Sequence, residues 1–207
     1  MAFTLFTTNP NEVNTSQTTP AASDVVAMLL PAWPDLNQNG ARTIAAQFMA
    51  ETGGGKFCFN WNLGNVKSGA DTPHMYLRNV WECDTVAGAA GQVASSSGLG
   101  HIATPEEIHT HGWACNSGVV VVFQPPHVQC RFRAYASLAE GAKLWLGHHQ
   151  RIATANAGYL PAINAGDIPA VAHFLKLSGY YTAAEANYAA NMATQKKAID
   201  TALGPII

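Results

Sequence analysis

The sequence predicts an α+β protein, because two helical segments enclose one segment with the composition of strands. Residues 24–51 and 137–203 carry apolar residues at helical spacing behind capping residues. Residues 75–86 and 118–135 are instead rich in valine and aromatic side chains, which favour a pleated, half-buried surface. This order is typical of the α+β class, so we expect a mostly helical domain with a small antiparallel β-hairpin lobe.

Composition limits the classes of function. The 207 residues suit one domain with a sizeable core. Charged residues make up 12% of the chain, about half of the roughly 25% usual in soluble domains. The net charge is −2 and the eleven Lys and Arg are scattered, so nucleic acid is not an expected partner. No stretch reaches the ~20 apolar residues of a membrane span. We also expect a monomer that needs no cofactor.

The chain begins with a predicted arm and a short helix. Residues 7–23 are rich in Thr, Asn, Ser and Pro. We therefore assign residues 1–23 to an extended N-terminal arm, which is followed by the domain at 24–207. Ser23 suits the N-cap of a helix that Pro31 and Pro34 bring to an end.

A second helix is expected over residues 40–51. Its apolar residues recur as one buried stripe, and Gly53 to Gly55 supply a C-terminal stop. Glu51 is thereby placed in the last turn, where the helix macrodipole disfavours a negative charge.

The two strand-like segments, 75–86 and 118–135, are expected to pair as a hairpin. Between them lies an insertion at 87–117, predicted as a Gly/Ser/Ala loop followed by a short helix. Thr104 caps that helix and Pro105 begins it.

Three helices are expected in the final third. The first starts at a capping box of Ser137 and Glu140, the second carries Asp167 before Pro169, and the third starts at a capping box of Thr182 and Glu185.

Three segments carry a resemblance to a known family. They are "AAQFMAETGGGKFCFNWNLGNVKS", "FRAYASLAEGAKLWL" and "LKLSGYYTAAEANYAANM". In this order they resemble the glucosaminidase domains of glycoside hydrolase family 73, which are similar to flagellar peptidoglycan hydrolases. The resemblance implies a lysozyme-like fold and cleavage of the β-1,4 bonds between N-acetylated sugars of peptidoglycan, with N-acetylglucosaminidase favoured over muramidase specificity.

Glu51 matches the family's catalytic glutamate. Glycoside hydrolysis needs a protonated carboxylic acid, and a helix C-terminus next to Phe57, Phe59 and Trp61 favours the neutral form. The resemblance also implies a second carboxylate on the first hairpin strand. Glu82 fits that position, and Asp84, two residues on, points to the same face and is its rival.

Further residues are candidates for substrate contact. Asn60 and Asn62 bring amides suited to hydroxyl and N-acetyl groups, Asn62 being favoured, while Trp61 can stack on a sugar face. Tyr181 matches the family's cleft tyrosine, and a buried core tyrosine is the alternative.

Other chemistries stay open. The insertion departs from the family and carries His109, His111 and Cys115, which with His127 or Cys130 could serve as zinc ligands of a peptidoglycan amidase. No metal site is expected, because the spacing matches no established zinc motif.

The four cysteines fit two disulfides or four thiols. Cys83 and Cys115 are expected to pair in an oxidising compartment and so close the insertion. Cys58 as a nucleophile is disfavoured by its apolar neighbours. A non-catalytic glycan-binding module is a third class of function.

The N-terminus has no positively charged segment before its apolar patch, so no Sec signal is recognised. A substrate in the periplasm or cell wall then implies another route, either a secretion-system effector with a cognate inhibitor or a phage lysin.

Overall fold

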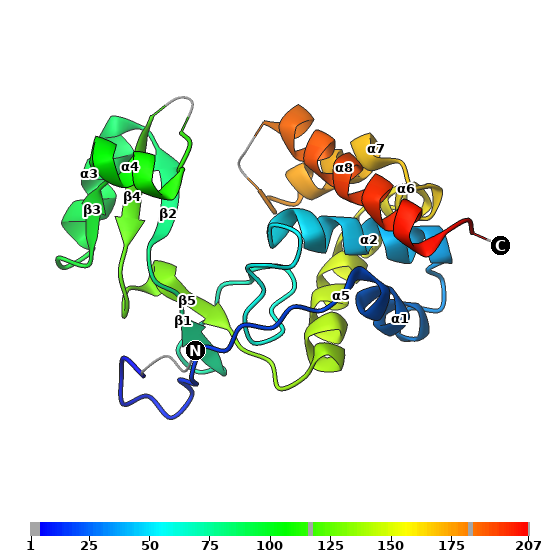
Figure 1. Cartoon of the computed structure of the whole chain (residues 1–207), viewed down its shortest axis with the longest axis horizontal. Coiled ribbons are helices and arrows are strands. Elements are labelled where there is room, and N and C mark those ends of the chain that lie inside the picture. Colours follow the sequence, from blue (N-terminus) through cyan, green and yellow to red (C-terminus); the bar gives the residue numbers. More distant parts are fainter. Residues whose placement is uncertain (1–4, 116–117, 182–183, 207) are drawn as a thin grey trace. The chain divides into compact units, whose positions relative to one another are not determined.

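A computed structural model describes residues 5–115, 118–181 and 184–206 (Figure 1). The chain forms two compact units. The first, here the β unit, comprises Met1–Ser16 and Lys67–Ala134, and the second, the helical unit, comprises Gln17–Val66 and Tyr135–Ile207. The predicted arm at 1–23 is divided between them. The α+β class is confirmed, with eight α-helices and two small antiparallel sheets among the described residues.

Six helices build the helical unit around one apolar core. Their bounds are α1 Ala22–Ala32, α2 Gln38–Glu51, α5 Leu138–Ala155, α6 Tyr159–Ala165, α7 Ile168–Leu177 and α8 Glu185–Leu203. Trp145, Phe48 and Leu29 are among the largest fully buried side chains of the core. Since α2 packs against α1, α6 and α8, it is the central helix of the unit.

The ends of α1 and α2 follow the predicted pattern in part. Helix α1 ends just before Pro34, but Pro31 lies inside it, and α2 begins at Gln38, two residues before the predicted start. The prediction that Ser23 caps α1 is wrong, because the helix begins at Ala22 behind Ala21 and has no side-chain cap. Asn37 caps α2 by accepting a hydrogen bond of 2.7 Å from the Gly40 amide. The predicted end of α2 at Glu51 is confirmed, and Gly53, Gly54 and Gly55 all adopt positive φ angles behind it.

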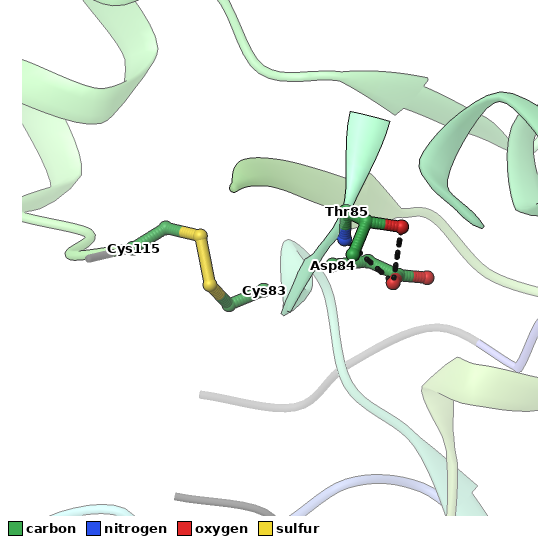
Figure 2. Close-up of a disulfide and its surroundings, with 4 residues drawn as sticks. All are labelled: Cys83, Asp84, Thr85 and Cys115. Atoms are coloured by element: carbon green, nitrogen blue, oxygen red, sulfur yellow. Dashed lines mark hydrogen bonds between the residues drawn. A yellow bond between two sulfur atoms is a disulfide. The ribbon is translucent and has the colours of Figure 1, made fainter. Parts of the chain in front are cut away.

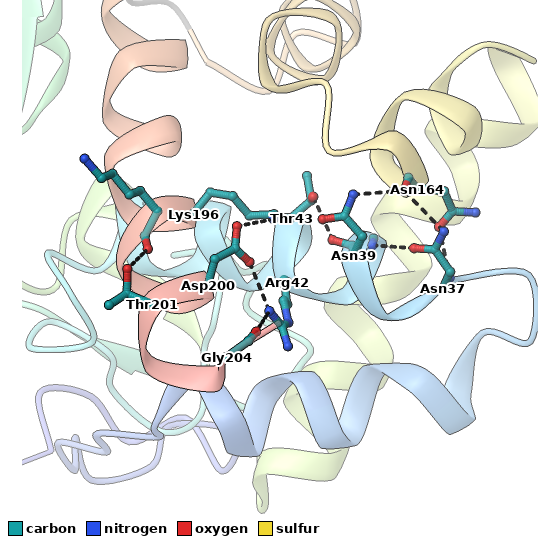
Figure 3. A network of polar contacts seen from close by, with 11 residues as sticks. Asn37, Asn39, Arg42, Thr43, Asn164, Lys196, Asp200, Thr201 and Gly204 are labelled. Atoms are coloured by element: carbon teal, nitrogen blue, oxygen red, sulfur yellow. Dashed lines mark hydrogen bonds and ion pairs between the residues drawn. The ribbon is translucent and has the colours of Figure 1, made fainter. Parts of the chain in front are cut away.

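Polar contacts fix the start of α2 to α6 and α8 (Figure 3). The Asn164 side-chain oxygen accepts from the Asn37 amide at 3.0 Å. Arg42 is only 2% exposed and donates from Nη1 to Asp200 Oδ1 at 3.3 Å and to the Gly204 carbonyl at 2.7 Å. These bonds tie α2 at its N-terminal half, so its C-terminal residue, Glu51, has a defined position.

The final third of the chain contains one helix that the sequence did not predict, the short α6. Ser137 caps α5 by accepting from the Glu140 amide, and Asp167 caps α7 by accepting from Ala170, as predicted. The Glu140 carboxylate accepts from Ala136 rather than from Ser137. Thr182 lies outside the described residues, and α8 starts at Glu185.

The strands of the β unit form two sheets. Their bounds are β1 His74–Tyr76, β2 Val80–Asp84, β3 Gly100–Ile102, β4 Val119–Phe123 and β5 Arg131–Arg133. Strand β1 pairs with β5, and β4 lies between β2 and β3, all antiparallel. Since β2 and β4 come from the two predicted strand segments, with Glu82 opposite Val121, their predicted pairing is confirmed. The predicted hairpin form is wrong, because β3 of the insertion pairs with β4 and makes this a three-stranded sheet.

The predicted loop at the start of the insertion is wrong. Residues Val86–Ser95 form helix α3, which Thr85 caps by accepting from the Gly88 amide at 3.1 Å. Ala89 of this helix is fully buried against a core that includes Val121 and Phe123. Its composition of small residues resembles that of a loop and concealed the helix. Helix α4, Pro105–His111, has the predicted Thr104 cap and a complete capping box with Glu107.

Cys83 and Cys115 form a disulfide, which confirms the predicted pairing (Figure 2). It joins β2 to the segment after α4, across 32 positions of sequence. Cys58 and Cys130 are free and buried. Within the described part of the chain, every helix is too short or too polar to cross a membrane.

Candidate active site

Glu51 is the last residue of α2 and is held by the chain turn that follows it. Thr52 donates from its amide and its hydroxyl to the Phe48 carbonyl, which closes the last helical turn. The left-handed glycines then reverse the chain, because such φ angles cost glycine little. The side chain of Glu51 is thus carried at the end of a rigid helix rather than on a loop.

Burial favours the neutral form of Glu51. Loss of solvent raises the pKa of its carboxyl, and a hydrogen bond from Tyr188 opposes this effect in part. The Tyr188 hydroxyl donates to Glu51 Oε1 at 2.6 Å. The predicted rise in pKa is thereby supported, although Phe57, one of the aromatic neighbours named for it, is 61% exposed.

Three tyrosines from the last third of the chain surround this carboxyl to different degrees. Tyr188 on α8 contacts Glu51 directly, and the Tyr181 ring stacks on Tyr188 with centroids 3.9 Å apart. The Tyr181 hydroxyl donates instead to the Ala172 carbonyl at 2.9 Å. Tyr180 donates to the Gly64 carbonyl at 3.2 Å, and burial together with the Glu51 charge raises its pKa. Tyr188, the downstream tyrosine of the third resembling segment, was given no role from the sequence, and it is the tyrosine whose hydroxyl contacts the Glu51 carboxyl.

Asn65 binds the backbone of Glu51. Its side-chain amide donates to the Glu51 carbonyl at 2.8 Å and so satisfies one of the unpaired carbonyls at the helix end. We also missed this residue from the sequence. Its place in the "NWNLGN" run, shortly after the glycines, was the available signal.

The other residues of that run hold the loop in shape. Asn62 is fully buried, and its amide group exchanges hydrogen bonds with the Val66 backbone at 3.0 and 2.8 Å. Asn60 and Trp61 both have positive φ angles, 45° and 56°. Asparagine tolerates this left-handed region, whereas it is costly for a bulky residue such as tryptophan. The Trp61 amide donates to Thr18, and the Asn60 carbonyl accepts from Tyr135. Asn62 is thus committed to the loop, whereas Trp61 is partly exposed.

Glu82 and Asp84 lie in the β unit, on one face of β2 as predicted. The Glu82 side chain is 46% exposed, and its nearest cation is Lys67 at 4.0 Å. Asp84 is committed to the start of α3, because it accepts from the Thr85 amide and from Gln92 Nε2, both at 2.7 Å. Of the two carboxylates, Glu82 is thus the more loosely held, since its ion pair with Lys67 is long and its side chain is half exposed.

The residues proposed as zinc ligands do not gather. Cys115 is in the disulfide, the His111 ring stacks on Trp113 at 4.5 Å, and the His127 ring stacks on Phe123. The described residues contain no group of three or more His, Cys, Asp or Glu that could hold a metal ion. Burial also raises the pKa of the Cys58 thiol, and this fits packing better than nucleophilic attack.

Comparison with models of known protein families, with curated proteins and with solved structures found no match to this chain. We therefore infer the chemistry of the site from the geometry of Glu51. A neutral carboxyl with Oε1 engaged by a phenol keeps its proton on Oε2, from which it can be transferred to a bound molecule. General acid catalysis is the chemistry that this arrangement suits.

Proposed function

We propose that this protein is a peptidoglycan hydrolase with a lysozyme-like fold, in which Glu51 is the general acid. The observation that carries the proposal is the buried carboxyl of Glu51 at a helix end, with a raised pKa and a hydrogen bond from the phenol of Tyr188. The resemblance of three ordered segments to family 73 supplies the substrate class, the β-1,4-linked N-acetylated glycan strand.

In this reaction the proton of Glu51 moves to the glycosidic oxygen as the bond from that oxygen to the anomeric carbon breaks. The leaving sugar departs as an alcohol, and the positive charge left on the other sugar is quenched by a nucleophile. Water that attacks directly gives up its proton to a second carboxylate, for which Glu82 is our candidate. A covalent intermediate, or attack by the substrate's own acetamido group, is hydrolysed by water in a second step and gives the product with retained anomeric configuration, whereas direct attack by water inverts it.

Tyr188 has a defined part in this chemistry. After proton transfer Glu51 carries a negative charge in a buried place, and the hydroxyl of Tyr188 donates to that charge. The hydrogen bond also fixes the rotamer of the carboxyl. Trp61 and Asn60 are the candidates for sugar contact in the neighbouring loop.

We place the substrate in the periplasm or cell wall and favour an antibacterial effector, which implies a cognate inhibitor protein as a partner. The favoured cleavage is that of an N-acetylglucosaminidase. The reducing-end sugar of the products identifies the bond that is cut, so digestion of purified peptidoglycan and mass spectrometry of the soluble fragments tests specificity and activity together.

The decisive variant is Glu51→Gln, which keeps the shape of the side chain and removes its proton. Release of fragments should fall by at least ~100-fold, the usual effect of losing a general acid. Asp24→Asn is the matched control, because Asp24 is an exposed carboxylate on α1 of the same unit. It should retain full activity.

Three outcomes would reject the mechanism. Near-normal turnover by the Glu51→Gln variant would exclude Glu51 as the acid. Binding of intact glycan strands without any release of fragments by the unmodified protein would instead identify a non-catalytic binding module. Release of stem peptides rather than sugar fragments would identify an amidase.

A further inference from the structure

Gln47 is a buried polar side chain that the proposed chemistry does not use. It lies on α2 and is 0% exposed. Neither its amide oxygen nor its amide nitrogen has a hydrogen-bond partner of regular geometry among the described residues. A buried amide with both polar atoms unpaired is costly, and an apolar side chain of equal size would pack without that cost. The presence of glutamine here calls for a partner.

The position of Gln47 points to that partner. Gln47 precedes Glu51 by four residues, so the two side chains lie on the same face of α2, one helical turn apart. The amide of Gln47 lies close enough to the phenols of Tyr180 and Tyr188 to lower their pKa values, against the larger raising effect of burial. The same two phenols also feel the Glu51 charge.

We infer that Gln47 is a positioning residue, whose two amide N–H groups donate to the phenol oxygens of Tyr188 and Tyr180. The inference rests on the proposed function for the role of Glu51 as an acid. A small rotation of the amide completes these bonds when Tyr188 donates to an ionised Glu51.

The donor inventory fits this assignment. Tyr188 has one hydroxyl hydrogen and gives it to Glu51, and Tyr180 gives its hydrogen to the Gly64 carbonyl. Each phenol oxygen is left with lone pairs that can accept. A glutamine amide has two N–H groups, one for each phenol. By donating to Tyr188, Gln47 polarises its O–H bond and strengthens the hydrogen bond that Glu51 receives.

Other titratable groups lie near Tyr180 and Tyr181. His148 lies against the Tyr180 ring, with centroids 5.0 Å apart, and its pKa is lowered mainly by burial. Lys176 Nζ lies 5.1 Å from the centroid of the Tyr181 ring, and the charge of Glu185 also acts on Tyr181. The charge of an ionised Tyr159 would also raise the pKa of Tyr180. These groups are the same in every variant used below, so they do not confound the comparison.

The test measures the ionisation of Glu51 directly, by NMR of side-chain carboxyl carbons in protein labelled at glutamate. The Glu51 signal is assigned by its absence from the Glu51→Gln variant. The variants are Gln47→Met, which keeps size and removes the amide, and Gln38→Met, a matched control at an exposed glutamine of the same helix. Tyr188→Phe and the double variant Gln47→Met/Tyr188→Phe complete the set.

We expect Tyr188→Phe to raise the pKa of Glu51, because the ionised form loses its donor. Gln47→Met should shift it in the same direction by a smaller amount, and Gln38→Met should not shift it. In the Tyr188→Phe background Gln47→Met should add nothing, since its effect passes through Tyr188. An unchanged titration in Gln47→Met, or an equal shift in both backgrounds, would overturn the inference.

A second measurement needs no variant and keeps the inference testable if Gln47→Met does not fold. In the unmodified protein the side-chain amide protons of Gln47 should change their chemical shift with the same midpoint as the Glu51 carboxyl. Amide protons that do not respond to that titration contradict the inference. Neither readout depends on turnover, so failure of the proposed function, seen as activity in Glu51→Gln, is distinguishable from failure of the role of Gln47.

Discussion

The hydroxyl of Tyr188 donates a hydrogen bond of 2.6 Å to Glu51 Oε1, across 137 positions of sequence. The bond joins the C-terminal residue of α2 to α8 by a direct contact of their side chains. Burial and the hydrogen bond act on the pKa of Glu51 in opposite directions, and burial has the larger effect. The carboxyl thus stays neutral to higher pH than usual, yet has a donor ready when it ionises.

The pH dependence of stability should reveal the cost of this burial. Because the folded-state pKa of Glu51 is raised, the folded protein binds the proton more tightly than the unfolded chain does. The free energy of unfolding should therefore fall as pH rises from the unfolded-state value through the folded-state value. Glu51→Gln removes the ionisation, so this variant should be more stable than the unmodified protein at pH 8.

Urea unfolding of both proteins at pH 4 and at pH 8 measures the effect. The stability advantage of Glu51→Gln should shrink at pH 4, where both states of the unmodified protein are largely protonated. An advantage that is equal at the two pH values would show that the ionisation of Glu51 is not coupled to folding.

The second carboxylate can be identified from the pH profile of hydrolysis. If Glu51 must be protonated and another carboxylate ionised, activity follows a bell, with the basic limb set by Glu51 and the acidic limb by the other group. We expect Glu82→Gln to remove most activity together with the acidic limb. Asp84→Asn should leave both in place, because Asp84 holds the start of α3.

Thermal unfolding of each variant provides the control, since Asp84→Asn can also weaken the cap of α3. A folded Asp84→Asn protein that has lost the acidic limb would transfer the role from Glu82 to Asp84.

The disulfide should stabilise the β unit. Closing a loop of 32 positions between Cys83 and Cys115 restricts the unfolded chain and is worth about 3.7 kcal/mol in the chain-entropy treatment. Replacing both cysteines by serine should lower the free energy of unfolding by roughly this amount. Thiol counting on unfolded, unreduced protein should find two thiols, from Cys58 and Cys130, and four would contradict the pairing.

Gly141 permits the close approach of the loop that carries Trp61. A Cβ at Gly141 would lie 2.1 Å from the Trp61 carbonyl oxygen, so Gly141→Ala must displace either α5 or the loop. We expect a loss of about 1–3 kcal/mol in the free energy of unfolding, typical of overpacking. Activity should also fall, because the same loop supplies Asn65 to the Glu51 backbone.

Gly147→Ala is the matched control on the same helix. A Cβ there meets only the end of Arg151, at 4.0 Å, so the change should stabilise α5 by up to about 1 kcal/mol through helix propensity. Chemical denaturation of the two variants side by side checks the contrast. Equal stability of the two variants would remove the argument for tight packing at Gly141.

Several features were determined by the sequence itself. The helix ends depend on residues within one or two turns of each other, and the strands depend on the composition of each segment. The end of α2 at Glu51 follows from the glycines behind it, and the start of α4 from Thr104, Pro105 and Glu107. The pairing of β2 with β4 follows from two valine-rich and aromatic segments. The raised pKa of Glu51 was also predictable in direction.

Tertiary structure alone decided which side chains meet. Tyr181 and Tyr188 look alike in the sequence, and only the packing of α8 against α2 brings the hydroxyl of Tyr188, not that of Tyr181, to Glu51. Local patterns do not report which face of a helix a distant segment will cover. For the same reason the helix at Val86–Ser95 was missed. Its composition resembles that of a loop, and the contact that buries Ala89 against Val121 and Phe123 is visible only in the folded chain.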